Sequence, residues 1–250
     1  MASSAEADDA RARYLDGTQL SIDPDWYEAN AGWKADQVRG ILARHRITPK
    51  AVCDVGCGTG GVLDALGRSL PPGTKLVGYE ISPDALAMAS ADRRERVTLV
   101  NDDPLLHDDH FDVMLVLDVF EHVEDHLGFL RRLRPRADHF VFIVPLDLSV
   151  QRVLRKSALV DSRYTIGHIH AFTRETALAT LADCGYRVLD EELVPAQLER
   201  PDQESRERLV KPLRRLLFAI NPGLAARVLG GFSLLVLADG QNSNVINVDR

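Results

Sequence analysis

The stretch AVCDVGCGTGG, from Ala51 to Gly61, decides the fold of this 250-residue chain. Its apolar first half, Ala51 to Val55, predicts a short strand, and a helical pattern, Val62 to Ser69, follows the turn. The turn between them holds three alternate glycines: Gly56, Gly58 and Gly60. Glycine lets the backbone turn sharply and lets a ligand approach the main chain, and the start of a helix offers unpaired N–H groups. The sequence therefore predicts a ligand site at this turn.

Composition places the chain among ordinary globular proteins. Hydrophobic residues make up 45% of it and charged residues 27%, and 250 residues are enough to bury one sizeable core. The net charge of −7 argues against a general nucleic-acid binder. The first residues do not resemble a signal peptide and no apolar run is long enough to span a membrane, so we expect a cytoplasmic protein. The cysteines suggest neither a disulfide framework nor a zinc site: Cys53, Cys57 and Cys184.

Apolar runs and helical patterns alternate along the chain. Further strands are predicted at Lys75 to Glu80, Arg96 to Val100, Phe111 to Leu117, Phe140 to Val144, Tyr186 to Val194 and Phe232 to Ala238. Helices are predicted at Trp26 to Arg46, Val123 to Leu133 and Thr173 to Cys184, with a further helix capped by Ser82 and opened by Pro83. This alternation predicts an α/β fold, a Rossmann-like doubly wound sheet of seven mostly parallel strands with helices on both faces.

We expect one domain with a tail at each end and one insert. Residues 1–20 are predicted to be a mobile tail, 21–240 the domain, and 241–250 a C-terminal tail, with a basic amphipathic insert at about 202–230. Residues 206–229 contain one acidic residue, Glu207, and six basic residues: Arg206, Arg208, Lys211, Arg214, Arg215 and Arg227. A basic amphipathic helix can lie on an anionic membrane, and it can equally pack over the protein's own cleft or against a second subunit.

Two acidic residues narrow the choice of ligand. Glu80 ends the second strand about twenty residues after the glycine turn, where an acid binds ribose hydroxyls in dinucleotide folds. Asp54 lies two positions before the first glycine, and its charge would repel a pyrophosphate. The spacing G-C-G-T-G also departs from the dinucleotide pattern, although Gly61 leaves that pattern formally satisfied. An acidic loop suits S-adenosylmethionine (SAM), which carries a sulfonium and an ammonium group, better than NAD.

Four motifs between residues 50 and 145 resemble those of the class I SAM-dependent methyltransferases. The resemblance implies that 21–240 is a methyltransferase domain in which Glu80 binds the ribose, Ile81 packs on the adenine and Asp102 binds the adenine amino group. Leu117 and Asp118 would line the methionine part of SAM. The cofactor residues implied are Asp54, Gly56, Cys57, Gly58, Gly60, Glu80, Ile81, Asp102, Asp103, Leu117 and Asp118.

The stretch DVFEHVED, from Asp118 to Asp125, has a second resemblance. Asp118, Glu121 and His122 are similar to the E-x-x-E-H motif of metal-dependent O-methyltransferases that act on quinone precursors or on the ends of small RNAs. A histidine further along completes the site in the RNA enzymes, and GHIHAFT offers His168 and His170 at a comparable place. Because Asp118 replaces the first Glu of that motif and shortens its reach, we assign no metal ligands.

Three histidines are candidate catalytic residues. Histidine is the usual general base near neutral pH, and methyl transfer to oxygen or nitrogen needs a free lone pair on the acceptor. His122 follows the fourth strand, near the expected position of the methyl group; His168 and His170 either share this role or order a loop. The basic stretch from Asp147 to Thr165 could meet an anionic substrate or be a solvated helix face.

We therefore expect a SAM-dependent methyltransferase that acts on an oxygen or nitrogen of a small molecule. One alternative is a metal-assisted O-methyltransferase that acts on a catechol, a quinone precursor or an RNA end. The other alternative is a SAM-binding protein without catalysis. Loss of activity with a chelator would favour the first alternative, and slow SAM turnover with every acceptor would favour the second.

Overall fold

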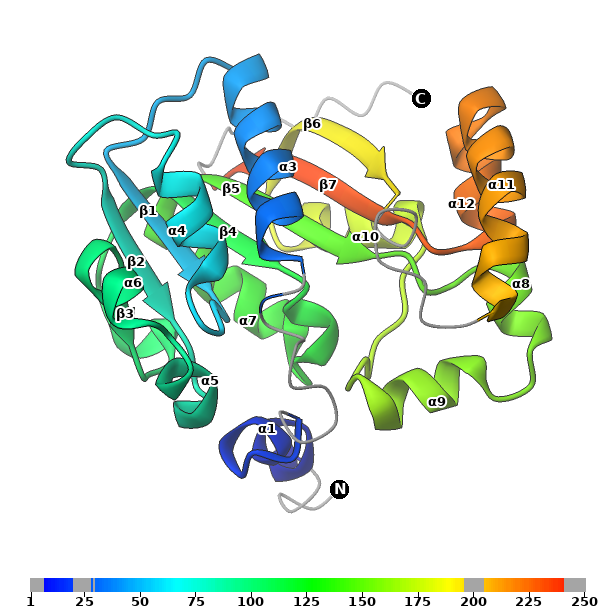
Figure 1. The fold of residues 1–250 in the computed structure, drawn as a ribbon, viewed down its shortest axis with the longest axis horizontal. Coiled ribbons are helices and arrows are strands. Elements are labelled where there is room, and N and C mark those ends of the chain that lie inside the picture. Colours follow the sequence, from blue (N-terminus) through cyan, green and yellow to red (C-terminus); the bar gives the residue numbers. More distant parts are fainter. Residues whose placement is uncertain (1–6, 20–27, 29, 196–204, 241–250) are drawn as a thin grey trace.

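Seven strands form one sheet at the centre of the molecule (Figure 1). The computed structural model describes residues 7–19, 28, 30–195 and 205–240. The strands lie in the order β3-β2-β1-β4-β5-β7-β6. Their bounds are β1 Ala51–Val55, β2 Lys75–Tyr79, β3 Thr98–Val100, β4 Phe111–Leu117, β5 Ala137–Pro145, β6 Arg187–Val194 and β7 Ser233–Asp239. The order reverses between β1 and β4, which is where open α/β sheets bind their ligands.

The strand directions confirm the predicted fold class. Strands β1 to β5 pair in parallel, and β7 lies antiparallel between β5 and β6. The observed β1 and β4 have the predicted bounds, and the other strands differ by a few residues at their ends. The third strand is the shortest because helix α6, Ala91–Arg96, ends only at Arg96, where the strand is predicted to begin. Ser90 is the N-cap of this helix, and its side chain accepts a bond from the Arg93 N–H. The sheet is thus mostly parallel, as the sequence indicates.

Helices cover both faces of the sheet (Figure 1). The helices are α1 Ala7–Leu15, α3 Ala31–Arg44, α4 Gly61–Gly67, α5 Pro83–Ala87, α6 Ala91–Arg96, α7 His126–Leu133, α8 Val150–Leu154, α9 Ala158–Thr165, α10 Arg174–Asp183, α11 Ser205–Ile220 and α12 Pro222–Leu229. Alternate residues of β4 pack into two hydrophobic cores on opposite faces of the sheet. Val113 and Leu115 pack with buried residues of α3 and α4, whereas Met114 and Val116 pack with buried residues of α7 and α10. Both faces of β4 are buried, which explains its continuous apolar sequence.

Helix α1 occupies part of the predicted tail, residues 1–20. Ala7–Leu15 is helical, and Arg13 and Tyr14 bond to residues far along the chain. Its sequence lacks an apolar stripe, because this helix contacts a cleft and not a core. The predicted helix at Trp26 to Arg46 is shorter, since α3 begins at Ala31; residues 20–27 and 29 lie outside the described part, as does the predicted tail 241–250.

Two helices between β5 and α10 have no counterpart among the predicted helix bounds, although a solvated helix face is one interpretation of this stretch. Helices α8 and α9 fill the basic stretch after Asp147, and Ser149 caps α8 by accepting a bond from the Arg152 N–H. By contrast, the cap predicted at Ser82 is confirmed, because its Oγ accepts a bond from the Ala85 N–H and Pro83 opens α5. No helix in the described part is long and apolar enough to cross a membrane.

Candidate functional site

A cavity of about 330 Å³ opens at the carboxyl ends of β1, β2 and β4. This volume is in the range of small-molecule sites. Ten predicted cofactor residues line it: Asp54, Gly56, Cys57, Gly58, Glu80, Ile81, Asp102, Asp103, Leu117 and Asp118. His122 also lines it, whereas Gly60, His168 and His170 do not. The structure therefore brings together almost all the residues that the glycine turn and the strand ends predict.

The glycine turn presents its backbone to this cavity. Gly58 has φ +56°, a left-handed conformation that costs glycine little, and its N–H donates to Glu80 Oε2 at 2.9 Å. Gly60, also left-handed, is the N-cap of α4, and a Cβ there would come within 2.8 Å of Leu99 Cδ2. Gly60 is therefore required for the shape of the turn, while Gly58 faces the ligand space.

Glu80 lies at the bottom of the cavity and ties the turn to the end of β2. Its two carboxylate oxygens accept bonds from the Gly58 N–H and, at 2.8 Å, from the Ser82 N–H. Burial raises the pKa of Glu80, and these backbone N–H groups oppose that shift. A ligand hydroxyl can still reach the remaining lone pairs of this carboxylate, because an ionised carboxylate offers about four acceptor positions.

Asp54 is a buried carboxylate at the end of β1. Burial raises its pKa to about 7, although the charge of Lys34 acts in the opposite direction. A buried, poorly compensated carboxylate favours a cationic partner, because the partner's charge repays part of the cost of desolvation. A cationic group in the cavity would therefore stabilise the ionised form of Asp54.

Asp118 is held in place at the end of β4 by a lysine that sequence reasoning missed. Its backbone has φ +57°, which is uncommon for a non-glycine residue, and its N–H donates to Ile143 O. Lys34 Nζ, from α3, lies 2.8 Å from Asp118 Oδ2. This ion pair holds the loop after β4 against α3, beside the cavity.

Asp102 and Asp103 follow β3 and are already engaged. Asp102 accepts a bond from the Asp103 N–H and lies 3.0 Å from His107 Nε2; these partners lower its pKa. Asp103 caps a short 3-10 helix and lies 3.3 Å from Arg11 Nη1 of α1. The wall formed by β3 is therefore linked to the N-terminal helix.

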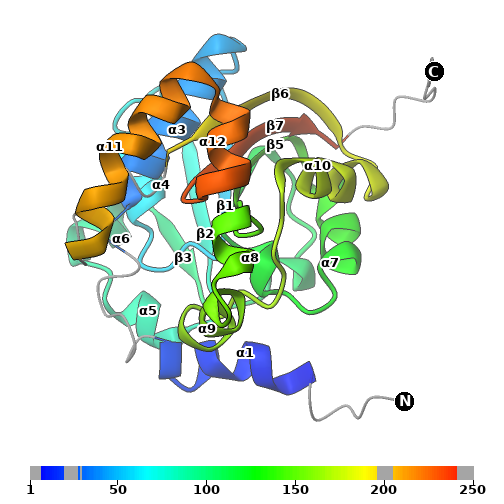
Figure 2. The same cartoon turned by 90° about the vertical axis from the view of Figure 1, so that its right-hand side faces the viewer.

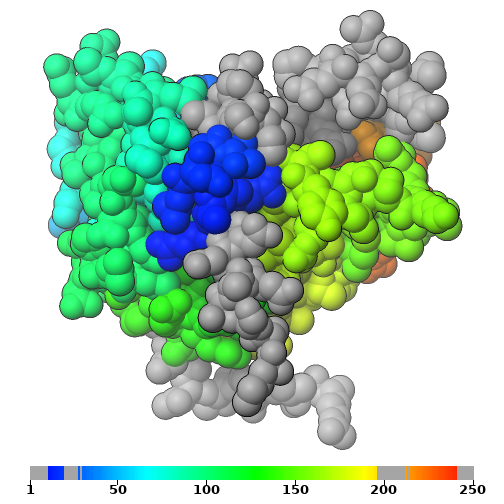
Figure 3. Space-filling view, turned by 90° about the horizontal axis from the view of Figure 1, so that it is seen from below, coloured from blue at the N-terminus to red at the C-terminus, as the bar shows by residue number. Residues whose placement is uncertain are grey.

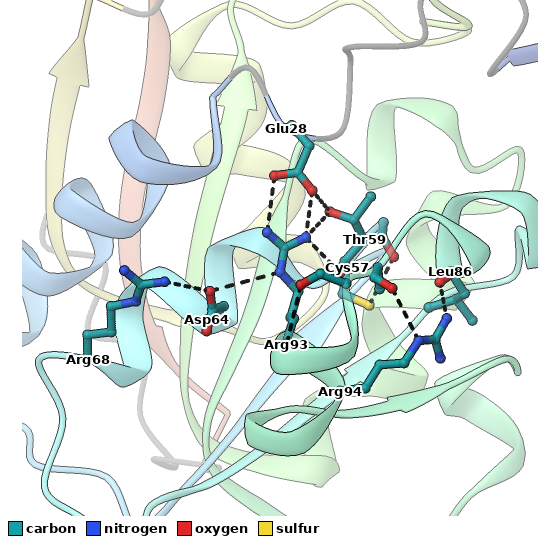
Figure 4. Close-up of polar contacts among 11 residues, drawn as sticks. Glu28, Cys57, Thr59, Asp64, Arg68, Leu86, Arg93 and Arg94 are labelled. Atoms are coloured by element: carbon teal, nitrogen blue, oxygen red, sulfur yellow. Dashed lines mark hydrogen bonds and ion pairs between the residues drawn. The ribbon is translucent and has the colours of Figure 1, made fainter.

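A cluster around Arg93 clamps the turn from outside (Figure 4). Arg93 Nη1 donates to Thr59 O at 3.1 Å, to Thr59 Oγ1 at 2.9 Å and to Glu28 Oε1 at 2.5 Å. Thr59 in turn donates its hydroxyl hydrogen to Glu28. The guanidinium thus joins α6, the glycine turn and the segment before α3, without lining the cavity.

Helix α1 lies across the mouth of the cavity. Figure 3 shows it between the strand-end loops of the first half of the chain and α9. Arg13 donates to the carbonyl oxygens of Arg163, Tyr164 and Thr165 at 3.2–3.3 Å, and the Tyr14 hydroxyl lies 2.9 Å from His122 Nδ1. Arg11 and Tyr14 both line the cavity, so α1 forms part of its wall.

His122 is the predicted catalytic histidine that reaches the cavity. Its Nδ1 lies 2.9 Å from Gly167 O as well as 2.9 Å from the Tyr14 hydroxyl. Burial, with a contribution from His168, lowers the pKa of His122 to about 3. The imidazole is therefore neutral near pH 7 and a much weaker base than a solvated histidine.

His168 and Glu121 lie behind His122. His168 Nδ1 bonds to Asp147, while His168 Nε2 and both Glu121 carboxylate oxygens are buried without a hydrogen-bond partner among the described residues. Burial and the charge of Asp118 raise the pKa of Glu121 well above its usual range. One ligand atom from each of Glu121, His122 and His168 lies within 4.8 Å of the others, which is a spacing that a metal ion can bridge.

His170 occupies a different place. Its Nε2 bonds to the carbonyl oxygens of Val123 and Glu124 at 3.0 and 3.2 Å, and its ring lies 4.2 Å from that of His126. These contacts order the loop after β4, as the alternative interpretation of this histidine expects. The geometry gives it no position beside the cavity.

Comparison with known proteins identifies the family. A family model described as a methyltransferase domain matches residues 31–191, which is more than half of the chain. No curated protein matches.

Solved structures share the fold at low identity. A putative sarcosine dimethylglycine methyltransferase from Galdieria sulphuraria is 16% identical, with a TM-score of 0.60 over 83% of this chain and 85% of that one. The plantazolicin methyltransferase BpumL, in complex with a triazolic desmethylPZN analog and S-adenosylhomocysteine (SAH), is 17% identical, with a TM-score of 0.59 over 95% of each chain. The magnesium protoporphyrin IX methyltransferase of Synechocystis PCC 6803, with bound SAH, is 16% identical, with a TM-score of 0.55 over 83% and 82%.

The family match and the fold agree with the residues of the cavity. Its glycine turn, its strand-end acids and its sheet order all correspond to the class I SAM-dependent methyltransferase pattern seen in the sequence. The chain belongs to the methyltransferase domain family.

Proposed function

We propose that this protein transfers a methyl group from SAM to an oxygen or nitrogen atom of a small molecule. The observation that carries the proposal is the pair of buried carboxylates, Asp54 and Glu80, which flank the glycine turn in one cavity. A cationic cofactor with a ribose fits such a pair, and a pyrophosphate would be repelled by it. The structures of similar fold that hold SAH support the same ligand class.

The residues of the chain supply binding and positioning. SAM, when bound, provides a methyl carbon on a sulfonium, which a lone pair of the acceptor can attack. Asp54 would hold the ammonium group and Glu80 the ribose hydroxyls, while Ile81 would pack against the base. Tyr14 and the rest of α1 exclude water from the mouth of the cavity. Holding two reactants in line can supply much of the rate without any other chemistry.

Neutral His122 would contact the methyl acceptor and would not act as its general base. A base with a pKa of about 3 does not remove a proton from an alcohol efficiently at pH 7. An acceptor that is nucleophilic without first losing a proton to the protein, such as a neutral amine or a phenolate, suits this site better than an aliphatic alcohol. The wall residue His122 would orient such a group by a hydrogen bond.

Calorimetry tests the cofactor assignment. SAM and SAH should bind, and NAD should bind at least about tenfold more weakly, a difference of roughly 1.4 kcal/mol. NAD as the tighter ligand would overturn the proposal. If SAM binds but is not consumed with any acceptor tested, the alternative of a SAM-binding protein without catalysis gains support.

A metal-assisted O-methyltransferase is the second candidate function, and one observation favours it. Glu121, His122 and His168 bring their ligand atoms within 4.8 Å, and three of the buried polar atoms there have no described partner. Hard divalent ions accept carboxylate oxygen, and imidazole nitrogen can join the ligands of softer divalent ions. Asp118, the first residue of the motif, is engaged with Lys34 and is not in this cluster.

Direct metal binding separates the two candidates without a known acceptor. After treatment with EDTA and desalting, the protein should take up one Mn²⁺ that Glu121→Gln removes. Glu124→Gln, a neighbouring change outside the cluster, serves as the matched control. Equal weak binding by all three proteins would reject the metal site and leave methyl transfer by positioning alone.

A further inference from the structure

Large apolar side chains are exposed mainly at one end of the molecule. Figure 2 shows helices α8, α9, α11 and α12 together at this end. Among the described residues, eight exposed large hydrophobic side chains lie on these four helices: Val150, Val153, Leu154, Val160, Tyr164, Leu216, Ile220 and Leu224. Three others are scattered elsewhere: Leu15, Met88 and Leu106. We call the surface formed by the eight residues the end face.

The four helices form one connected surface. Helix α12 packs against both α8 and α11, and α8 packs against α9. Arg214 of α11 is buried, and its Nη2 donates to Leu229 O at 3.2 Å and to Gln151 Oε1 at 3.4 Å, which links α11 to the end of α12 and to α8. The exposed apolar side chains therefore belong to four helices that pack against one another.

The end face is basic in an acidic protein. The whole chain has a net charge of −7, but Val150 to Thr165 holds four basic residues and a single acid, Asp161. Those four are Arg152, Arg155, Lys156 and Arg163. Residues 214–229 add three arginines and no acid. Arg152 and Arg227 are paired with Asp147 and Glu175, and Arg214 is buried. Arg155, Lys156 and Arg215 are exposed and make no ion pair with any described residue, so their charges are available to a partner.

This combination fits one kind of partner. Aliphatic and aromatic side chains that protrude beside cations can enter the outer part of a bilayer while the cations meet anionic headgroups. A second copy of the chain would bring the cations of two end faces together, which like-charge repulsion disfavours. Apolar patches of this kind mark interaction sites in soluble proteins.

We propose that the end face docks on an anionic lipid surface. The docking is peripheral, since no described helix can span a bilayer. The face borders the cleft, because the last carbonyl groups of α9 bond to Arg13 of the α1 cover and the following Gly167 bonds to His122. Docking does not depend on methyl transfer, so each proposal can fail without the other.

Sedimentation of the full chain with vesicles tests the proposal. The protein should bind vesicles of phosphatidylcholine with phosphatidylglycerol, bind vesicles of phosphatidylcholine alone at least about tenfold more weakly, and lose binding in high salt. Leu154→Glu, at a side chain that is 79% exposed, should reduce binding by about tenfold or more and leave the fold intact. Leu106→Glu, at a residue that is 74% exposed but lies outside the end face, is the matched control.

A second variant and the oligomeric state complete the test. Arg155→Glu with Lys156→Glu should also reduce binding to anionic vesicles, because two unpaired cations are reversed. Equal binding to neutral and anionic vesicles, or an equal loss in the Leu106→Glu control, would overturn the proposal. The proposal would also be overturned if the protein does not bind vesicles and instead forms a dimer that Leu154→Glu dissociates. That result would identify a second copy of the chain as the partner of the end face.

Discussion

At the scale of single residues, Glu80 has the largest expected effect on SAM binding. Both of its oxygens accept backbone N–H bonds, so Glu80→Gln places an amide nitrogen against one of those donors and removes the charge that would bind the ribose. The loss of bonds to a charged group should weaken SAM binding by roughly 1.5–3 kcal/mol. Isothermal titration calorimetry measures this, and Glu95→Gln on the exposed side of α6 is the control.

Asp102 gives the comparison at the same scale. The Asp102 side chain is 40% exposed, so water competes with a ligand for its carboxylate, whereas Glu80 is buried. Asp102→Asn should therefore cost less SAM affinity than Glu80→Gln. Negligible losses in both variants would show that the nucleoside does not lie along the ends of β2 and β3.

At the scale of elements, the Arg93 clamp should control the glycine turn. Arg93→Met keeps much of the aliphatic length but removes the bonds to Thr59 and Glu28. Because Gly56, Cys57 and Gly58 of the turn line the cavity, loosening the turn should weaken SAM binding by about tenfold, or roughly 1.4 kcal/mol. Arg94→Met is the matched control, because Arg94 lies on the same helix but bonds to Leu86 and Ala89. Similar affinities in both variants would contradict a clamping role.

Helix α1 should govern how fast the cofactor leaves. Arg13→Ala combined with Tyr14→Phe removes the bonds that hold this helix to α9 and to His122. Stopped-flow release of SAH should then become faster by roughly tenfold, because a cover over a cleft limits dissociation. Arg39→Ala, at an exposed pair with Asp36 on α3, is the control. Unchanged release in the double variant would mean that α1 does not close the cavity.

At the scale of the whole molecule, Asp54 should lower the stability of the ligand-free protein. Its carboxyl has a pKa of about 7 when folded, against an ordinary value of 3.8. The folded state therefore binds the proton more tightly than the unfolded state does. The resulting penalty is absent below pH 3.8, grows as the pH rises to 7 and is constant above that.

Asp54→Asn should remove this penalty. The free energy of unfolding, from urea titrations, should exceed that of the wild type by roughly 2–4 kcal/mol at pH 8 and by less at pH 5, while SAM binding weakens. Asp108→Asn, at a fully exposed side chain, is the control. A gain at Asp54 that is the same at both pH values would indicate that its carboxyl does not titrate between them.

Much of the fold could be predicted because it is encoded locally. The parallel strand Phe111–Leu117 is buried on both faces, so its apolar run has clear ends, and the glycine turn marks the connection of β1 to α4. The bounds of helices α8 and α9 could not be predicted, because their large apolar residues are exposed and give no core-facing stripe. The same reason applies to α1, whose contacts are made at the cleft.

The cavity could be predicted where a residue lies at the end of a strand, as Asp54 does, or directly follows one, as Glu80 and Asp118 do. Lys34 and Tyr14 could not, because they come from helices far away in sequence and belong to no motif. The neutral state of His122 also depends on burial by distant segments, so the sequence suggested a stronger base than the structure provides. Long-range packing is the information that a single sequence lacks.

The pairing of β6 with β7 has a consequence for the history of this chain. Val194, the last residue of β6, pairs directly with Ser233, the first residue of β7. The connection that contains α11 and α12 therefore leaves the sheet and returns to it at the same pair of residues. Such a connection can be lengthened, shortened or exchanged by recombination without shifting the register of a single strand. Helices α11 and α12 can thus change during evolution while the sheet and the cavity at its strand ends stay the same.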